Sequence, residues 1–172
     1  REALMPELPE VETVARRLRE GLGAPSLLGR TIREARVLWP REIHGASPAT
    51  FIAELAGARV RAVKRLGKYL IVELEKVSKL ETRDFAMLVH LRMSGKLDVV
   101  PEAEAFTKHA RVVWLLDNGL ALRFDDARKF GRVYLPKRVG EVLEKIGPDA
   151  LLISEDEFVQ RLRAKKGAIK PL

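Results

Sequence analysis

Residues 58 to 124 contain a succession of short apolar runs bounded by turn residues, and this pattern most limits the folds open to the chain. In "ARVRAV" apolar and basic residues alternate, and after the turn "KRLG" the run "KYLIVELE" reads as a strand buried on at least one side. "AMLVHLRMSGKLDVV" predicts two strands broken at Ser94 and Gly95. "RVVWLLDNGLALRF" predicts a hairpin whose turn is "DNG". Short strands joined by local turns predict a mostly antiparallel structure.

Helical patterns flank these strands. From Pro9 to Leu22 apolar residues recur at the i, i+3, i+4, i+7 spacing of a one-faced helix. A short helix is expected after Ser47, and Ser154 with Glu157 three residues on forms the capping box of a last helix. The segment Thr31 to Trp39 reads as a further strand. The predicted fold is mainly β with flanking helices: a two-layer antiparallel β-sandwich or flattened barrel with an N-terminal and a C-terminal helix.

Composition sets the size and the charge. At 172 residues, 47% of them hydrophobic, the chain can bury a core and has the usual size of one domain. Its 32 basic and 24 acidic residues give a net charge of +8, which attracts polyanions such as nucleic acid, although a basic surface also serves solubility alone. The lack of cysteine excludes disulfides and thiolate metal sites from this chain. No apolar run approaches the roughly 20 residues of a membrane span, so no membrane partner is expected.

The stretch "PELPEVET" places Pro6 and Glu7 before the first helix, where Pro9 already suits the first turn. A proline at a mature N-terminus carries a secondary amine, and an α-amino group titrates at about pH 8, so part of it is unprotonated at neutral pH. Such an amine can attack a sugar C1′ and form an iminium ion, and a neighbouring carboxylate can move the protons. The simpler interpretation is that two prolines stiffen the terminus.

Lys68 in "KRLGKYL" follows a tight turn at Gly67 and begins an apolar strand. This position holds its ammonium at the end of the sheet, where a lysine can donate a proton or contact a phosphate. The alternative is a surface lysine that extends its charge into water.

Two further segments, "HLRMSG" and "FDDARKFG", each place an apolar side chain at a turn that contains glycine. Met93 is this residue in the first, and Phe130, two residues after Arg128, is this residue in the second. An enzyme that acts on a base within a duplex must flip the base out. Apolar side chains pushed into the stack, with an arginine in the vacated space, lower the cost. Taken singly, Met and Phe at turns are more often core residues.

Together these segments resemble the formamidopyrimidine-DNA glycosylases, a family that removes oxidised purines such as 8-oxoguanine from DNA. "PELPEVET" resembles the mature N-terminus of the family almost letter for letter. Other motifs follow in the family's order, namely "GKYL", "HLRMSG", "KHARV", "RFDDARKFG" and "AIKPL". The resemblance covers the chain from Pro6 onward and implies a two-layer β-sandwich with flanking helices, in agreement with the pattern.

The resemblance implies catalytic roles for three residues. Pro6 matches the nucleophile that displaces the damaged base and forms a Schiff base with the deoxyribose. Glu7 matches the acid beside it. Lys68 matches the residue linked to β-elimination of the 3′ phosphate.

Six residues match positions that contact DNA. Met93, Arg128 and Phe130 match the triad inserted into the duplex where the lesion was. Arg128 also matches one of the family's direct DNA contacts. The remaining matches, at DNA-contacting positions or near the lesion pocket, are His109, Lys165 and Lys170.

The sequence also departs from the family. Residues 1–5 precede Pro6, and the peptide bond from Met5 makes the Pro6 nitrogen a tertiary amide that cannot attack. We expect these residues to be an extension or a tag remnant, and the chain to be inactive if they stay in place. Ala127 and Lys129 stand where the family usually has proline and arginine.

We expect residues 6–167 to form an N-terminal catalytic domain. Residues 168–172 are then expected to begin a second half, with a helix-two-turn-helix and a zinc finger, that this chain lacks. The resemblance therefore implies no cofactor in this chain, because a chain without cysteine cannot build that zinc site.

The expected function is base-excision repair by a bifunctional DNA glycosylase and AP lyase. It acts as a monomer on damaged double-stranded DNA in the cytoplasm of a bacterium, at the nucleoid. One alternative is a truncated, non-catalytic module that binds lesions or DNA, which the residues before Pro6 favour. The other is a basic RNA-binding β-protein, indicated by charge alone and without the exposed aromatic pair and glycine pattern of the common RNA-binding sheet.

Overall fold

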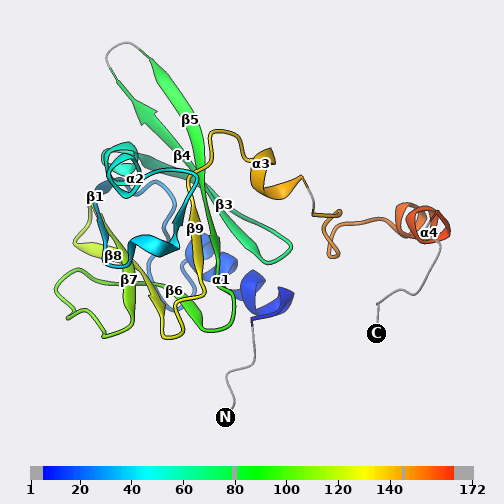
Figure 1. Cartoon of the computed structure of the whole chain (residues 1–172), viewed down its shortest axis with the longest axis horizontal. Helices are drawn as coiled ribbons and strands as arrows, with labels where there is room; N and C mark the ends of the chain where they lie inside the picture. The colour runs from blue at the N-terminus through cyan, green and yellow to red at the C-terminus, as the bar shows by residue number, and fades with distance from the viewer. Residues whose placement is uncertain (1–5, 79–80, 145, 165–172) are drawn as a thin grey trace.

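A computed structural model describes residues 6–78, 81–144 and 146–164. Within these ranges nine strands form two sheets with helices around them (Figure 1). The elements in chain order are α1 (Leu8–Glu20), β1 (Ile32–Val37), the 3-10 helix η1 (Pro40–Glu42), β2 (Ile43–His44), α2 (Pro48–Leu55), β3 (Arg59–Leu66), β4 (Tyr69–Val77), β5 (Thr82–His90), β6 (Gly95–Pro101), β7 (Ala110–Leu116), β8 (Leu120–Asp126), β9 (Arg132–Tyr134), α3 (Gly140–Leu143) and α4 (Glu155–Arg163).

The two sheets confirm the predicted sandwich with one exception. The four-stranded sheet has the order β1-β7-β8-β6 and is antiparallel throughout. The five-stranded sheet has the order β2-β9-β5-β4-β3, and its short β2–β9 pair is parallel. These two strands are far apart in the sequence, so no hairpin between them imposes an antiparallel direction.

The core lies between the sheets and extends under α1 and α2. Trp114 and Phe124 contribute from the four-stranded sheet, Met87 from the five-stranded sheet and Phe51 from α2, and all four are fully buried. The predicted apolar face of the first helix is confirmed at Val11, Ala15 and Leu18, which α1 buries. It is wrong at Leu22, which is exposed because the helix ends at Glu20 with Gly21 as its C-cap residue. The core thus fixes α1, and with it the residues just before α1, against the sheets.

Helix α1 begins differently from the prediction. Glu7 is its N-cap residue, and the Glu7 backbone N–H donates to Glu10 Oε2 at 3.0 Å. The sequence placed Glu7 before the helix and Pro9 at its start, and the structure corrects this, because Glu7 is the N-cap residue of a helix that begins at Leu8. The reason is that a glutamate three residues into the helix reaches back to the cap, which a proline in the first turn cannot do.

The strand breaks follow the turn residues closely. The "DNG" turn joins β7 to β8, and Gly119 has a φ of 74°. A turn at Gly67, with a φ of 55°, and Lys68 joins β3 to β4. The predicted break at Ser94 and Gly95 lies slightly earlier, at residues 91–94, because Gly95 already pairs with Asp126 of β8.

The C-terminal helix is confirmed, although it packs on neither sheet. Ser154 Oγ accepts the Glu157 N–H at 3.2 Å, as the capping box predicts. Figure 1 shows α4 away from both sheets, and none of its residues is buried against the described part of the chain. Its apolar residues Phe158 and Leu162 are exposed. Between residues 6 and 164, the described helices include none long and apolar enough to cross a membrane.

Candidate active site

Pro6 lies just before α1 and lines a pocket of about 610 Å³. Met93 and His109, which the sequence singled out separately, line the same pocket. Two carboxylates that the sequence did not indicate, Asp98 and Asp125, also line it. The fold therefore brings together residues from four distant segments around the residue predicted to be the nucleophile.

Beside this pocket Glu7 and Lys68 form an ion pair. Lys68 Nζ lies 2.7 Å from Glu7 Oε2, with the two side chains 33% and 60% exposed. Lys68 reaches the N-terminus of α1 from the turn between β3 and β4. Glu7 directly follows Pro6, so this carboxylate and the Lys68 ammonium lie next to the predicted nucleophile. Such a pair can transfer a proton at this site.

Arg65 fixes the two halves of this ion pair relative to each other. Its guanidinium is 4% exposed and donates from Nε to Glu12 Oε2 at 2.8 Å. Nη1 donates to the carbonyl of Gly67 at 3.0 Å, and Nη2 donates to Asp149 Oδ1 at 2.9 Å. One side chain thus ties the helix that begins next to Glu7 to the turn that carries Lys68.

Arg65 and its carboxylate partners shift each other's pKa in the direction that keeps each group charged. The hydrogen bond from Arg65 is the main cause that holds the pKa of Asp149 below its ordinary value. Burial by itself lowers the pKa of Arg65, but the hydrogen bonds to Asp149 and Glu12 outweigh it and raise this pKa. The network therefore stays charged at neutral pH.

His90 presents a neutral ring next to Lys68. Burial, with smaller contributions from the charges of Arg92 and Lys68, lowers the pKa of His90 to about 4. Nδ1 accepts the backbone N–H of Arg92 at 3.1 Å, so the neutral ring carries its hydrogen on Nε2. The sequence indicated no role for His90, because its burial and its neighbouring cations become visible only in the fold.

The two predicted apolar wedges lie in separate loops, which we call the Met93 turn (residues 91–94) and the Phe130 loop (residues 127–131). Phe130 is 49% exposed, so a place in the core is excluded for it. The Arg128 guanidinium lies 5.3 Å from the centroid of the Phe130 ring. Met93 is half-buried at the pocket. An exposed aromatic ring with an arginine over it is available for contact with a base stack.

Five cations around the Phe130 loop, Arg41, Arg92, Arg128, Lys129 and Arg132, form what we call the cation cluster. Lys129 Nζ and the Arg41 guanidinium lie 3.9 and 5.8 Å from the Trp39 ring centroid. Arg132 Nη1 lies 2.6 Å from His44 Nε2 and donates to the Arg41 carbonyl at 3.5 Å. Within residues 6–78, 81–144 and 146–164 no carboxylate forms an ion pair with any member of the cluster.

The absence of these ion pairs leaves the positive charge available to an anionic ligand. Cations elsewhere on the domain, such as Arg61 and Lys64, do pair with carboxylates. The cation cluster is therefore one part of the described surface whose basic side chains have no carboxylate partner.

Comparison with known proteins agrees with this geometry. The model of the formamidopyrimidine-DNA glycosylase N-terminal domain matches residues 5–133. The chain belongs to the formamidopyrimidine-DNA glycosylase family. Formamidopyrimidine-DNA glycosylases of Herpetosiphon aurantiacus and Chloroflexus aggregans are 41% and 42% identical to it, over 97% and 98% of the chain. The chain spans 59% and 58% of the length of these relatives.

Solved structures of the formamidopyrimidine-DNA glycosylase family share the fold. The complex between Lactococcus lactis Fpg and an abasic site containing DNA has a TM-score of 0.64 and 27% sequence identity, over 92% of this chain and 48% of that chain. A complex of the Lactococcus lactis protein with a THF-DNA and an inhibitor gives the same TM-score and identity. The predicted β-sandwich with flanking helices is thus confirmed by relatives as well as by the structure.

Some predictions made from the resemblance to the formamidopyrimidine-DNA glycosylases stay predictions. Lys165 and Lys170 lie outside the described residues, as do residues 1–5 and the segment 168–172. The part of the chain that the structure describes has no group of three His, Asp or Glu able to hold a metal ion, and the chain has no cysteine. The expected absence of a cofactor and the expected domain bounds are therefore not tested.

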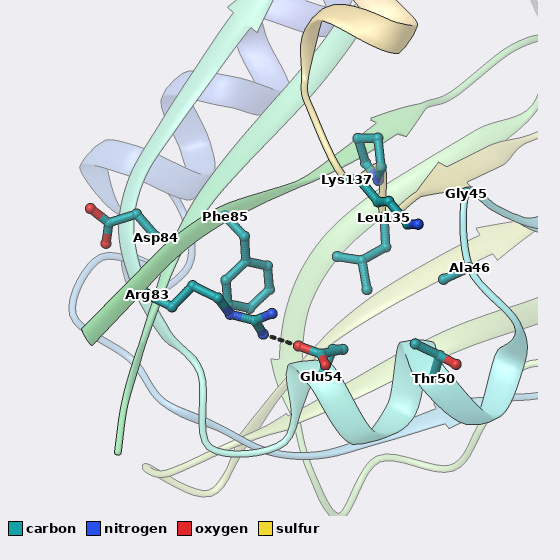
Figure 2. Close-up of a pocket in the computed structure, with 10 residues that line it drawn as sticks. Gly45, Ala46, Thr50, Glu54, Arg83, Asp84, Phe85, Leu135 and Lys137 are labelled. Carbon is teal, nitrogen blue, oxygen red and sulfur yellow. Dashed lines mark hydrogen bonds and ion pairs between the residues drawn. The ribbon is translucent and has the colours of Figure 1, made fainter. Parts of the chain in front are cut away.

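A second pocket, of about 460 Å³, lies between α2 and β5 (Figure 2). Arg83 of β5 forms an ion pair with Glu54 of α2, and its guanidinium lies 5.1 Å from the Phe85 ring centroid. None of the residues that match formamidopyrimidine-DNA glycosylase motifs lines this pocket. The Arg83 pair therefore serves to hold α2 against β5.

Close packing beneath the Phe130 loop gives a stability prediction. A Cβ on Gly131 would lie 2.4 Å from Cζ of the fully buried Phe124 ring, so Gly131→Ala is expected to lower the free energy of unfolding by about 1–3 kcal/mol. A Cβ on Gly147 meets nothing within 4 Å, and Gly147→Ala is expected to change the free energy of unfolding by less than about 0.5 kcal/mol. Urea denaturation measures both variants. Equal losses of stability would contradict the close contact between Gly131 and Phe124.

Proposed function

We propose that the protein works in base-excision repair as a DNA glycosylase and AP lyase that removes oxidised purines from double-stranded DNA. The observation that carries the proposal is the position of Pro6, at a pocket shared with Met93 and His109 and next to the Glu7–Lys68 ion pair. Relatives that bear the glycosylase name support it, although the chain spans less than two thirds of their length.

In the proposed reaction the secondary amine of an N-terminal Pro6 attacks C1′ of the damaged nucleotide. The glycosidic bond breaks with its electron pair on the base, and the Pro6 nitrogen loses its proton as the sugar ring opens to an iminium ion. Glu7 moves the proton between this nitrogen and the ring oxygen. The iminium ion acidifies the hydrogen on C2′, and its removal expels the 3′ phosphate. We assign Lys68 to this elimination because it contacts Glu7 at 2.7 Å.

DNA binding is assigned to the loops and the cations around them. Met93, Arg128 and Phe130 enter the space left by the extruded nucleotide. The cation cluster contacts phosphates, since its charges have no carboxylate partner among the described residues. His109, Lys165 and Lys170 are proposed as further DNA contacts. We place this work in the bacterial cytoplasm, at the nucleoid, with the protein acting as a monomer.

A non-catalytic DNA-binding module is the second candidate function. The peptide bond between Met5 and Pro6 favours it, because an acylated nitrogen has no lone pair free for attack. The two candidates differ in whether the Pro6 nitrogen forms a covalent bond with DNA, which requires Pro6 to be the first residue.

Borohydride trapping on a duplex with an abasic site separates these candidates. A chain that begins at Pro6 is expected to give a covalent adduct that mass spectrometry maps to Pro6. The whole chain from Arg1 is the matched control and is expected to give none. In the chain that begins at Pro6, Lys68→Ala is expected to keep the adduct while strand cleavage slows about 100-fold. Binding without an adduct in that chain would leave the non-catalytic module as the function.

A further inference from the structure

Asp126, the last residue of β8, is fully buried and binds both loops at once. Its Oδ1 accepts the backbone N–H of Arg128 at 3.2 Å and also the hydroxyl of Ser94. Its Oδ2 accepts the backbone N–H of Gly131 at 2.7 Å. Ser94 belongs to the Met93 turn, whereas Arg128 and Gly131 belong to the Phe130 loop. The carboxylate therefore joins two segments more than 30 residues apart in the sequence.

The loops also close over one aromatic ring. A Cβ on Gly95, the residue after the Met93 turn, would lie 2.9 Å from Cε2 of Phe124. A Cβ on Gly131 would lie 2.4 Å from Cζ of the same ring. Glycine at both positions lets the two backbones approach Phe124, which lies two residues before Asp126 on β8.

Each loop contains one residue held in a left-handed backbone conformation. Arg92 has a φ of 55° and Lys129 a φ of 59°, and in residues 6–78, 81–144 and 146–164 they are the only residues other than glycine with positive φ. Such a conformation persists only where the surrounding contacts determine it. The shared carboxylate and the shared ring supply those contacts for both loops.

We propose that Asp126 couples the Met93 turn to the Phe130 loop, so that Met93, Arg128 and Phe130 form one preorganised wedge. The three side chains come from two loops, and ordering them before DNA arrives reduces the entropy lost on binding. Asp126 is a positioning residue, because it is buried and acts through the backbones and the Ser94 hydroxyl. The nature of the ligand rests on the proposed function, whereas the coupling is a property of the free protein.

Hydrogen exchange of the free 172-residue chain tests the coupling without DNA. Ser94→Ala removes the hydroxyl that donates to Asp126 and that also accepts the Arg128 N–H at 3.2 Å. The test is therefore read at the amide of Gly131, which binds Asp126 Oδ2 and not Ser94. This amide is expected to exchange about tenfold faster, the effect of losing one hydrogen bond to a charged group. Ser26→Ala is the matched control, since Ser26 Oγ is half-buried and donates to the Arg19 carbonyl at 2.7 Å.

A purely local role of Asp126 gives a different result. If the carboxylate only stabilised its own loop, Ser94→Ala would change exchange in the Met93 turn and at Arg128, whose N–H binds Ser94 Oγ directly, but not at Gly131. Unchanged exchange at Gly131 would therefore overturn the proposal.

Binding to a duplex with a tetrahydrofuran abasic-site analogue tests the wedge itself. Met93→Ala and Phe130→Ala are measured singly and together, in the parent and in the S94A background. In the parent, the fold loss of affinity in the double variant is expected to be smaller than the product of the two single fold losses, because either change already disrupts the wedge. In the S94A background, the double variant is expected to lose affinity by the full product of the single fold losses. A loss equal to that product in the parent would refute a joint wedge.

The two experiments separate the coupling from the proposed function. Faster exchange at Gly131 in S94A, together with no affinity of the parent for the duplex, would retain the coupling and refute the DNA function. Tight binding of the parent to the duplex, together with unchanged exchange at Gly131 in S94A, would refute the coupling and retain the DNA function.

Discussion

Arg65→Met is expected to lower the free energy of unfolding by about 3–5 kcal/mol, the cost of removing one partner from a buried ion pair. Methionine fills much of the space of the arginine stem but leaves the Asp149 carboxylate, 6% exposed, without its cation. It also removes the donors to Glu12 and to the Gly67 carbonyl. Urea denaturation at neutral pH measures the loss.

Lys64→Met is the matched control for this effect. Lys64 is the neighbouring residue on β3 and pairs with Glu73 at 2.5 Å, but the two side chains are 59% and 40% exposed. A solvent-exposed pair contributes at most about 1 kcal/mol. Equal losses in the two variants would show that burial of Arg65 is not the source of its effect.

Acidity provides a second check on Arg65. Its hydrogen bond lowers the pKa of Asp149 in the folded protein, so this stabilisation is complete above the unfolded value of about 3.9 and is lost as the pH falls through the lower folded value. The difference between the parent and Arg65→Met is therefore expected to shrink in acid. A difference that stays constant would assign the effect to packing.

Elements with local signals were predicted well from the sequence. The apolar spacing in α1, the "DNG" turn and the Ser154 cap each depend on residues a few positions apart. The parallel β2–β9 pair was not predicted, because Ile43 and Val133 meet only through the tertiary fold. The exposure of α4 was not predicted either, since an amphipathic pattern reports an apolar face and not what packs on it.

The candidate site residues also differ in how visible they are in the sequence. Pro6 and Lys68 could be singled out because a position near a terminus and one after a tight turn each suggest a chemical role, and these roles stay predictions. Arg65 was missed because it stands among other basic residues in "ARVRAVKRLG", and its burial depends on Asp149, 84 residues away. A pattern read from neighbouring residues cannot indicate a partner that lies far away in the sequence.

Asp126 could have been found from periodicity. Leu122 and Phe124 precede it at intervals of two on β8, and all three side chains are buried. Alternation along a strand places residues at this interval on one face. The neighbouring acid, Asp125, lies on the other face and lines the pocket of Pro6. The adjacent aspartates in "FDDARKFG" therefore have different environments. The apolar residues at intervals of two before Asp126 indicate that Asp126, and not Asp125, lies on the buried face.

Glu42 lies beneath the Phe130 loop and is the one buried carboxyl group here without a hydrogen-bond partner for either oxygen among the described residues. It is 1% exposed. Burial and the charge of Asp126, against the opposing charges of Arg111, Arg132 and Lys129, raise the pKa of Glu42 to about 8. The buried group is thus protonated at neutral pH.

Glu42→Gln is expected to make the protein more stable than the parent at alkaline pH, by a few kcal/mol in order of magnitude. The folded pKa of Glu42, about 8, lies above its ordinary value of 4.5, so its contribution is complete below pH 4.5 and is lost as the pH rises through 8. The parent's free energy of unfolding should therefore fall between these values. Glutamine stays neutral at every pH, so Glu42→Gln should remove most of this dependence of the free energy of unfolding on pH.

Urea denaturation over this pH range measures both proteins, with Glu144→Gln as the control at an exposed carboxylate. If the free energy of unfolding changes with pH in the same way in the parent and in Glu42→Gln, ionised Glu42 must be stabilised by a hydrogen bond or a cation. The charge of Asp126 opposes ionisation of Glu42, and Glu42 ionises in the folded protein only as the pH rises through about 8. Affinity for an abasic-site duplex is therefore expected to fall as the pH rises through about 8 in the parent, and to fall less in Glu42→Gln. An equal decline in both proteins would show that ionisation of Glu42 is not its cause.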